Sequence, residues 1–338
     1  MMGGGRKKAK PVSQALVYLT VTIVAIWSAV PFFWAVQTSI KFVFDVASRV
    51  PVLWGYDTTA DAYKSFWFED QSTSMWKVGG FLFLLAFVLV VLVLVGRRVR
   101  RGWPFFTAAF AALAVAMWLF PKVFDVKTEY SFFINSVIIT AATVLISISI
   151  GMLAGYGLAR YTGVSGAVIL IVALAFRALP RSAFVLPYFF AAKNFNLLDR
   201  RIVIILALVA INQPFTIWMF RSFFMQVPRE LEEAAMMDGA GRLVAFRKVI
   251  VPIMWPAIIA TSLFTTLLAY NEFLFVRLLA PTKWTLPVAM VALTGGEGSG
   301  SLTESAAAAV SITFPIIILI VLFQKHLVKG LASGAVKG

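Results

Sequence analysis

The sequence has no cysteine and only one histidine, His326, in 338 residues. The lack of thiols excludes disulfides and thiol nucleophiles, and a single histidine leaves few ligands for a metal ion. Charged residues are also scarce, at 13%, whereas hydrophobic residues make up 61%. This balance lies outside the usual composition of soluble domains, so we expect a membrane protein that uses no metal and no cofactor.

Apolar runs recur along the whole chain, and the mean hydropathy is high, at +0.89. Several runs are long enough to cross the hydrocarbon layer of a membrane, which takes about 20 helical residues. The sequence therefore predicts an all-α fold, a polytopic transmembrane helical bundle with about eight spans. The predicted spans are Ala15–Val36, Gly79–Gly96, Trp103–Phe120, Phe132–Leu158, Gly166–Phe190, Ile202–Phe220, Val249–Tyr270 and Ser305–Phe323.

Basic residues outnumber acidic ones, and the formal net charge is +15. They cluster in short segments before the first span, in Arg97–Arg101, and between the sixth and seventh spans. Under the positive-inside rule both chain ends are cytoplasmic, with residues 1–14 and 326–338 as cytoplasmic tails. Basic clusters at membrane ends bind anionic lipid, so we expect membrane lipid and not nucleic acid as their partner.

Residues 41–131 differ in composition from the spans on either side. Their first part, up to residue 78, is rich in aromatic residues and predicts a lobe on the external side. Spans two and three follow, joined only by residues 97–102 and nearly free of polar side chains, which predicts an inserted hairpin facing lipid. The chain is therefore divided into a first span at 15–40, this lobe with its hairpin, and a core at 132–325.

The loop between spans six and seven contains a short predicted helix over residues 229–241. A proline precedes it, three glutamates lie at the positive end of the helix dipole, and glycines mark where it stops. Leu231, Ala234 and Ala235 recur at helical spacing and form one narrow face. Such a face fits closely into a groove on another protein.

This loop resembles the EAA signature of permease subunits of ATP-binding-cassette (ABC) importers. Glu233-Ala234-Ala235 is followed after three residues by Gly239, and after nine more by Val249-x-Val251-Pro252. Other segments are similar, in the same order, to the maltose-type carbohydrate-uptake permeases. These segments are Pro31–Lys41, Asn135-Ser136, Gly155–Arg160, Arg177–Pro180, Leu197–Asp199, Tyr270–Phe273 and Gly330–Gly338. The resemblance covers about residues 15–41 and 132–338.

The resemblance implies the type I ABC importer permease fold with an extra transmembrane hairpin. It also implies an assembly in a bacterial or archaeal inner membrane. The partners would be a second permease subunit, expected to form a heterodimer, two ABC ATPase subunits and an external solute-binding protein. The chain itself would not be an enzyme, because it has no phosphate-binding glycine loop and the ATPase is a separate subunit. The solute would be a sugar, as mono- or oligosaccharide, or a polyol.

In this scheme the helix at 229–241 rests on the ATPase and transmits its movement. Glu233 holds the helix by polar contact or dipole capping, Gly239 lets the chain turn, and Pro252 sets the angle at which movement enters the seventh span. Simple solvation is the alternative for Glu233. The full set of predicted ATPase-coupling residues is Glu233, Ala234, Ala235, Asp238, Gly239 and Pro252.

Polar side chains at membrane depth are the candidates for the substrate path, because such groups face a cavity or a partner helix and not lipid. Hydrogen bonding between helices is an equally common use of them. Arg177 either pairs with Glu272 or extends to the interface. The path candidates are Asn135, Asn212, Gln213, Tyr270, Asn271 and Glu272, with Thr265 and Thr266 beside them.

An ion-coupled secondary transporter of a small solute is the main alternative function. Such carriers usually show internal repeats and carboxylates within their spans, whereas only Glu272 lies near that depth here. An intramembrane enzyme is disfavoured because His326 has no evident nucleophile partner, and a structural scaffold would not need the EAA-like helix.

Overall fold

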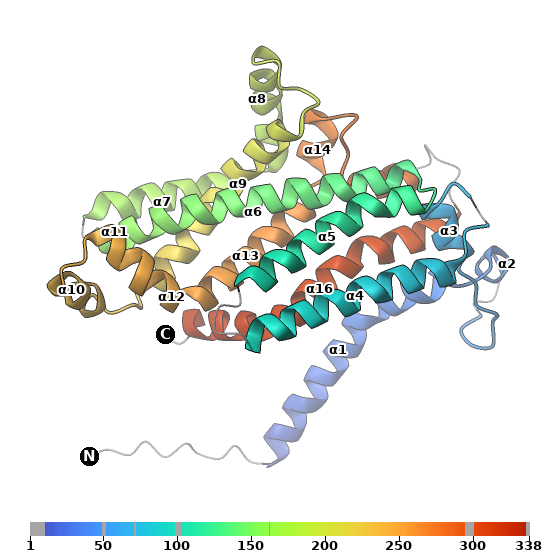
Figure 1. The fold of residues 1–338 in the computed structure, drawn as a ribbon, viewed down its shortest axis with the longest axis horizontal. Helices are drawn as coiled ribbons and strands as arrows, with labels where there is room; N and C mark the ends of the chain where they lie inside the picture. Colours follow the sequence, from blue (N-terminus) through green and yellow to red (C-terminus); the bar gives the residue numbers. More distant parts are fainter. Residues whose placement is uncertain are drawn as a thin grey trace.

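The computed structural model describes residues 11–48, 52–70, 72–98, 103–161, 163–294 and 301–335. Within these ranges the chain is a bundle of long helices (Figure 1). Two bent helix pairs and the shorter apolar helix α5 (Trp103–Val123) complete the candidates for membrane spans. The predicted all-α membrane bundle is confirmed. The helices that are each long and apolar enough to cross a membrane are α1 (Pro11–Ser39), α4 (Met75–Arg98), α6 (Thr128–Arg160), α9 (Arg201–Phe224) and α16 (Leu302–Ala335).

Short helices fill the connections between the long ones. At one end of the bundle lie α2 (Val43–Val46) and α3 (Asp61–Trp67), in the predicted lobe (Figure 1). Two more, α14 (Leu274–Leu279) and α15 (Leu286–Thr294), precede α16. At the opposite end lie α10 (Glu230–Met237), α11 (Arg242–Ala245), the π-helix η1 (Phe246–Ile250) and α12 (Val251–Ile253).

The fifth predicted span is a bent pair of helices. α7 (Val164–Arg177) and α8 (Arg181–Asn194) meet at 96°, and α8 projects from the side of the bundle next to α14 (Figure 1). Pro180 accounts for the break, because proline has no N–H to donate and disfavours the helical conformation of the residue before it. The single helix predicted over Gly166–Phe190 is therefore corrected to two.

The seventh predicted span is bent at its start. The arm Arg242–Ile253 and α13 (Trp255–Tyr270) meet at 76°. Pro252 and Pro256 lack the N–H groups that a continuous helix needs, and the wide π-turn of η1 ends two residues before Pro252. The straight span predicted from Val249 therefore begins at Trp255 instead.

α6 and α9 form the centre of the bundle, and α9 is the most buried span candidate. Two glycines of α6 let the two helices approach closely. A Cβ on Gly151 would lie 2.5 Å from Thr216 Cγ2, and one on Gly155 would lie 2.6 Å from Phe220 Cβ. Small residues four apart are a common way for membrane helices to pack, since little else separates the backbones.

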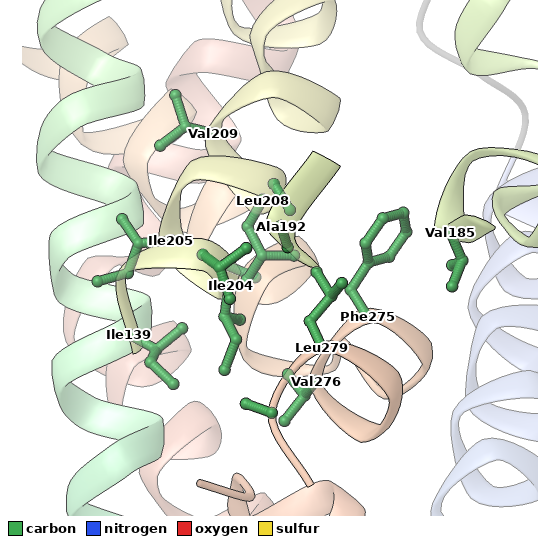
Figure 2. Packing of buried hydrophobic residues seen from close by; sticks show 14 of the residues in the cluster. Ile139, Val185, Ala192, Ile204, Ile205, Leu208, Val209, Phe275, Val276 and Leu279 are labelled. Atoms are coloured by element: carbon green, nitrogen blue, oxygen red, sulfur yellow. The ribbon is translucent and has the colours of Figure 1, made fainter. Parts of the chain in front are cut away.

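An apolar cluster fixes the projecting helices to the first half of α9. Figure 2 shows Ile204 and Leu208 of α9 beside Phe275 and Leu279 of α14, with Ala192 of α8 among them. Each of these side chains is at most 3% exposed. α8 and α14 are therefore packed parts of the core.

The hairpin α4–α5 and the first helix lie at the periphery. Only 6% of the apolar stretch of α4 is buried inside the bundle, and the apolar stretch of α1 is 0% buried. The hairpin is joined to the lobe by rings of Phe68, Phe81, Phe120 and Phe124, whose centroids lie 4.9 to 6.2 Å apart. The apolar side chains left exposed suit the lipid-facing surface that the sequence predicts for the hairpin.

The predicted tails are only partly described. α16 continues to Ala335, so most of the C-terminal tail predicted at 326–338 is helical. Residues 1–10 of the predicted N-terminal tail, residues 99–102 of the hairpin turn and residues 336–338 lie outside the described ranges.

Candidate functional site

α10 forms at the end of the bundle where α6 stops and α9 ends (Figure 1). Arg229 is its N-cap residue, and Glu230, Glu232 and Glu233 stand in its first turn. Carboxylates there interact favourably with the unpaired N–H groups and the positive end of the helix dipole. The predicted acidic start of this helix is confirmed.

α10 ends in a left-handed turn at Gly239, which has a φ of +86°. The N–H of Gly239 bonds to the carbonyl of Met236, and the N–H of Ala240 bonds to that of Ala235, both at 3.0 Å. These two bonds make a Schellman motif, which closes the last turn and favours glycine. The predicted turn at Gly239 is confirmed, but the helix ends at Met237, earlier than predicted, with Asp238 as its C-cap.

Glu232 joins α10 to the last turn of α6. Its Oε1 accepts a hydrogen bond from Arg160 Nε at 2.8 Å, and its Oε2 accepts one from the Tyr156 hydroxyl at 2.8 Å. Arg160 also donates to the carbonyls of Phe224 at 3.3 Å and Val227 at 3.2 Å, at the end of α9. Side-chain exposure is 17% for Arg160 and 11% for Glu232. We call Arg160, Glu232 and Tyr156 the α10 joint.

The opposite surface of α10 is open. Leu231 is 40% exposed, Met236 is 39% exposed and Met237 is 87% exposed. Exposed apolar side chains on a short helix outside the apolar bundle indicate a contact with another protein. Of the predicted coupling residues, Glu233, Ala234, Asp238, Gly239 and Pro252 are exposed, and Ala235 is half-buried.

The α10 joint was not predicted from the sequence, although its residues were part of the argument. Glu232 was counted only as one of the three glutamates at the positive end of the helix dipole, and Arg160 only as the last residue of the segment Gly155–Arg160. A usable signal was their location, since a lone arginine closing one span and an acidic loop on the same side of the membrane attract one another.

Two of the predicted path residues form hydrogen bonds to distant parts of the chain. Asn135 of α6 donates to the carbonyl of Trp284 at 2.9 Å and accepts from Arg201 Nε at 2.8 Å. The Tyr270 hydroxyl donates to the carbonyl of Ile312 at 3.0 Å. These bonds join helices within the chain, which is the second of the two uses considered for such residues.

The remaining path candidates have different surroundings. Asn271 is exposed, and Asn212 is buried in α9. Gln213 Nε2 donates to the carbonyl of Ser147 at 3.3 Å, while its Oε1 is buried without a partner among the described residues. Thr265 is buried and bonds within its own helix. The six candidates therefore do not converge on one point through hydrogen bonds.

Glu272 pairs with Arg181 and not with Arg177. Glu272 is 2% exposed, and its carboxylate also accepts from the N–H of Phe275 at 3.4 Å. The guanidinium of Arg177 instead lies 4.6 Å from the centroid of the Phe215 ring. The bend at Pro180 explains the difference, because it directs the first residue of α8 toward Glu272.

The chain is thus a helical membrane component with a short helix exposed at one end of its bundle. Residues 147–333 match the family model "Binding-protein-dependent transport system inner membrane component". This match covers more than half of the chain, and it includes α9, α10 and residues 147–160 at the end of α6. The chain belongs to this family.

Named relatives agree with the family. The chain is 34% identical over 220 residues to the probable ABC transporter permease protein y4oR of Sinorhizobium fredii, covering 64% of this chain and 78% of that protein. It is 36% identical over 211 residues to the trehalose transport system permease protein SugB of Mycobacterium tuberculosis, covering 61% and 76%. It is 33% identical over 206 residues to the trehalose/maltose transport system permease protein MalG of Thermococcus litoralis, covering 60% and 74%.

A solved structure shows the same fold. A chain in the crystal structure of a bacterial ABC transporter that imports the acidic polysaccharide alginate superposes with a TM-score of 0.63. The alignment covers 94% of this chain and 98% of that one, at 19% sequence identity. At this identity the likeness supports the arrangement of helices and nothing about the solute.

Proposed function

We propose that this chain forms half of the translocation pathway of an ABC importer for a sugar or polyol, and that α10 couples the pathway to a separate ATPase. The observation that carries the proposal is α10 itself, a short capped helix held to the bundle on one side and exposed on the other. Its EAA-like residues lie within the family match. Relatives named for trehalose, maltose and maltodextrin transport favour a carbohydrate solute.

The assembly proposed with this function has four kinds of partner. A second, related permease covers apolar surface that one chain leaves open, two ATPase subunits receive the α10 helices, and an external binding protein delivers the solute. α10 is then cytoplasmic, as are both chain ends, in the inner membrane of a bacterium or archaeon. Family membership disfavours the ion-coupled carrier, because relatives in this comparison are named as permease proteins of ABC transporters.

Uptake in membrane vesicles carrying the whole transporter tests the proposal. ATP-dependent uptake of a panel of labelled sugars and polyols should occur, and Glu233→Lys should abolish it. Glu230→Lys is the matched control, because Glu230 is also exposed in the first turn of α10 but lies outside the EAA-like motif. Uptake that persists without ATP but follows an ion gradient would instead establish the carrier.

Topology and ATPase contact can be tested with single cysteines, because the chain has none of its own. Met237→Cys, at an 87% exposed side chain of α10, should be protected from a membrane-impermeant maleimide added outside the cell. It should also crosslink to the ATPase subunit. Asp57→Cys, in the predicted external lobe, should react with the same reagent, and the reverse pattern would invert the proposed topology.

A further inference from the structure

The ends of α10 are short turns that could act as hinges. Residues 225–229 connect it to α9, and residues 238–241 connect it to α11. A helix held only by two such turns would swing when a partner pushed it, and the movement would be lost before it reached the membrane helices. Transmission needs a contact that fixes α10 to the bundle between its two turns.

The α10 joint supplies this contact. Both carboxylate oxygens of Glu232 are used, one by Arg160 and the other by Tyr156 of α6. The guanidinium of Arg160 also reaches the carbonyls of Phe224 and Val227, so α6, α9 and α10 meet at one side chain. A planar guanidinium suits this role because its donors point in fixed directions.

Close packing below the joint makes it stiff. The ring of Tyr156 lies 5.5 Å from that of Phe224 on α9 and 4.7 Å from that of Phe246 on η1. A Cβ on Gly155 would lie 2.9 Å from the backbone nitrogen of Arg221, so α6 and α9 touch directly here. α10 is thereby linked both to the helix before it and to the arm after it.

We infer that Arg160 and Glu232 are positioning residues for energy coupling: they make α10 move as one body with the ends of α6 and α9. The inference rests on the proposed function of α10. Movement of α10 then reaches α6 and α9, the two central helices, directly. Without the pair, the ATPase still binds the exposed surface of α10. Its movement then rotates α10 about the two turns at its ends and does not reach α6 and α9.

The test measures solute imported per ATP hydrolysed by the complete transporter. In Arg160→Met and in Glu232→Gln this ratio should fall at least about fivefold, the low end of the coupling factors between two protein sites. The double variant should lose little more than either single one, because both remove the same contact. Arg160→Lys keeps the charge but not the guanidinium, and should recover part of the loss.

Glu230→Gln is the matched control and should leave the ratio unchanged. Crosslinking of Met237→Cys to the ATPase, measured in each variant, separates the two proposals. An unchanged ratio with the crosslink present would overturn the positioning role alone, whereas absence of the crosslink in the otherwise unaltered chain would overturn the proposed function. If the Arg160→Met variant fails to accumulate, the ratio of solute imported to ATP hydrolysed in the near-isosteric Glu232→Gln variant tests the positioning role.

Discussion

Within the part of the chain that the structure describes, two arginine–glutamate pairs join segments of the bundle, and they differ in how many groups they hold. In the α10 joint both partners are shielded from solvent, and Arg160 lies where α6 and α9 end, so its charge also faces two negative helix ends. In the other pair Glu272 is buried, but Arg181 is 44% exposed and stands in the first turn of α8, the unfavourable end for a cation. The first pair closes three helix ends, whereas the second neutralises one buried carboxylate.

Pairs of the same residue types therefore differ in what their loss does to stability. Removing one partner of a shielded pair leaves a buried charge without compensation. Where one partner is half-exposed, water replaces part of the lost interaction. Substitutions at the two pairs therefore test the comparison directly.

The largest effect is expected at the α10 joint. Arg160→Met should lower the free energy of unfolding by about 3 kcal/mol. The substitution leaves the carboxylate of Glu232 without its cation and the two carbonyls at the end of α9 without their hydrogen-bond donor. A denaturant titration of the purified chain in detergent measures it. A loss no larger than that of the second pair would remove the distinction between them.

A smaller effect is expected at the second pair. Arg181→Met should lower the free energy of unfolding by about 2 kcal/mol, since Glu272 keeps the N–H of Phe275 but loses its cation. The same titration measures it, and Arg177→Met is the control, because Arg177 contacts the Phe215 ring and not Glu272. Equal losses at Arg177 and Arg181 would argue against the pairing.

Next in size is the uncharged turn beside the α10 joint. Gly239→Ala should lower the free energy of unfolding by about 1 kcal/mol because its φ of +86° strains any residue with a Cβ. Space is not the cause, since no other heavy atom lies within 4 Å of the added Cβ. Gly241→Ala, at a φ of −66°, is the matched control and should change stability little.

The smallest effect concerns Asp199, in the loop between α8 and α9. The hydroxyl and the N–H of Thr282 donate to its carboxylate and hold its pKa below the usual range. Its contribution is therefore present above the ordinary aspartate pKa and is lost as pH falls through the lowered one. The melting temperatures of the native chain and of Asp199→Asn should converge at low pH. At neutral pH the free energies of unfolding should differ by less than about 1 kcal/mol, since solvent screens the group. A constant gap across pH would contradict this.

Much of the fold could be predicted because lipid imposes a strong rule on sequence. A membrane helix must be about 20 apolar residues long and satisfy its own backbone hydrogen bonds, so the apolar runs in the sequence located the long helices. α10 was also predictable, since its glutamates and Gly239 are local signals for the two ends of a helix. The bends at Pro180 and Pro252 were only partly predictable, because a proline can kink a helix or end it, and the neighbouring helices decide which.

The membrane class, the long helices, the turn at Gly239 and the EAA-like resemblance of the loop can be predicted from sequence, because all of these depend on residues close together in the chain. The three-dimensional packing was needed to show that Glu232 binds Arg160, that Glu272 binds Arg181 instead of Arg177, and that Asn135 bonds to both Trp284 and Arg201. These contacts connect residues far apart in sequence. Their partners depend on bend angles and on the close approach at Gly151 and Gly155, which packing sets and local sequence does not.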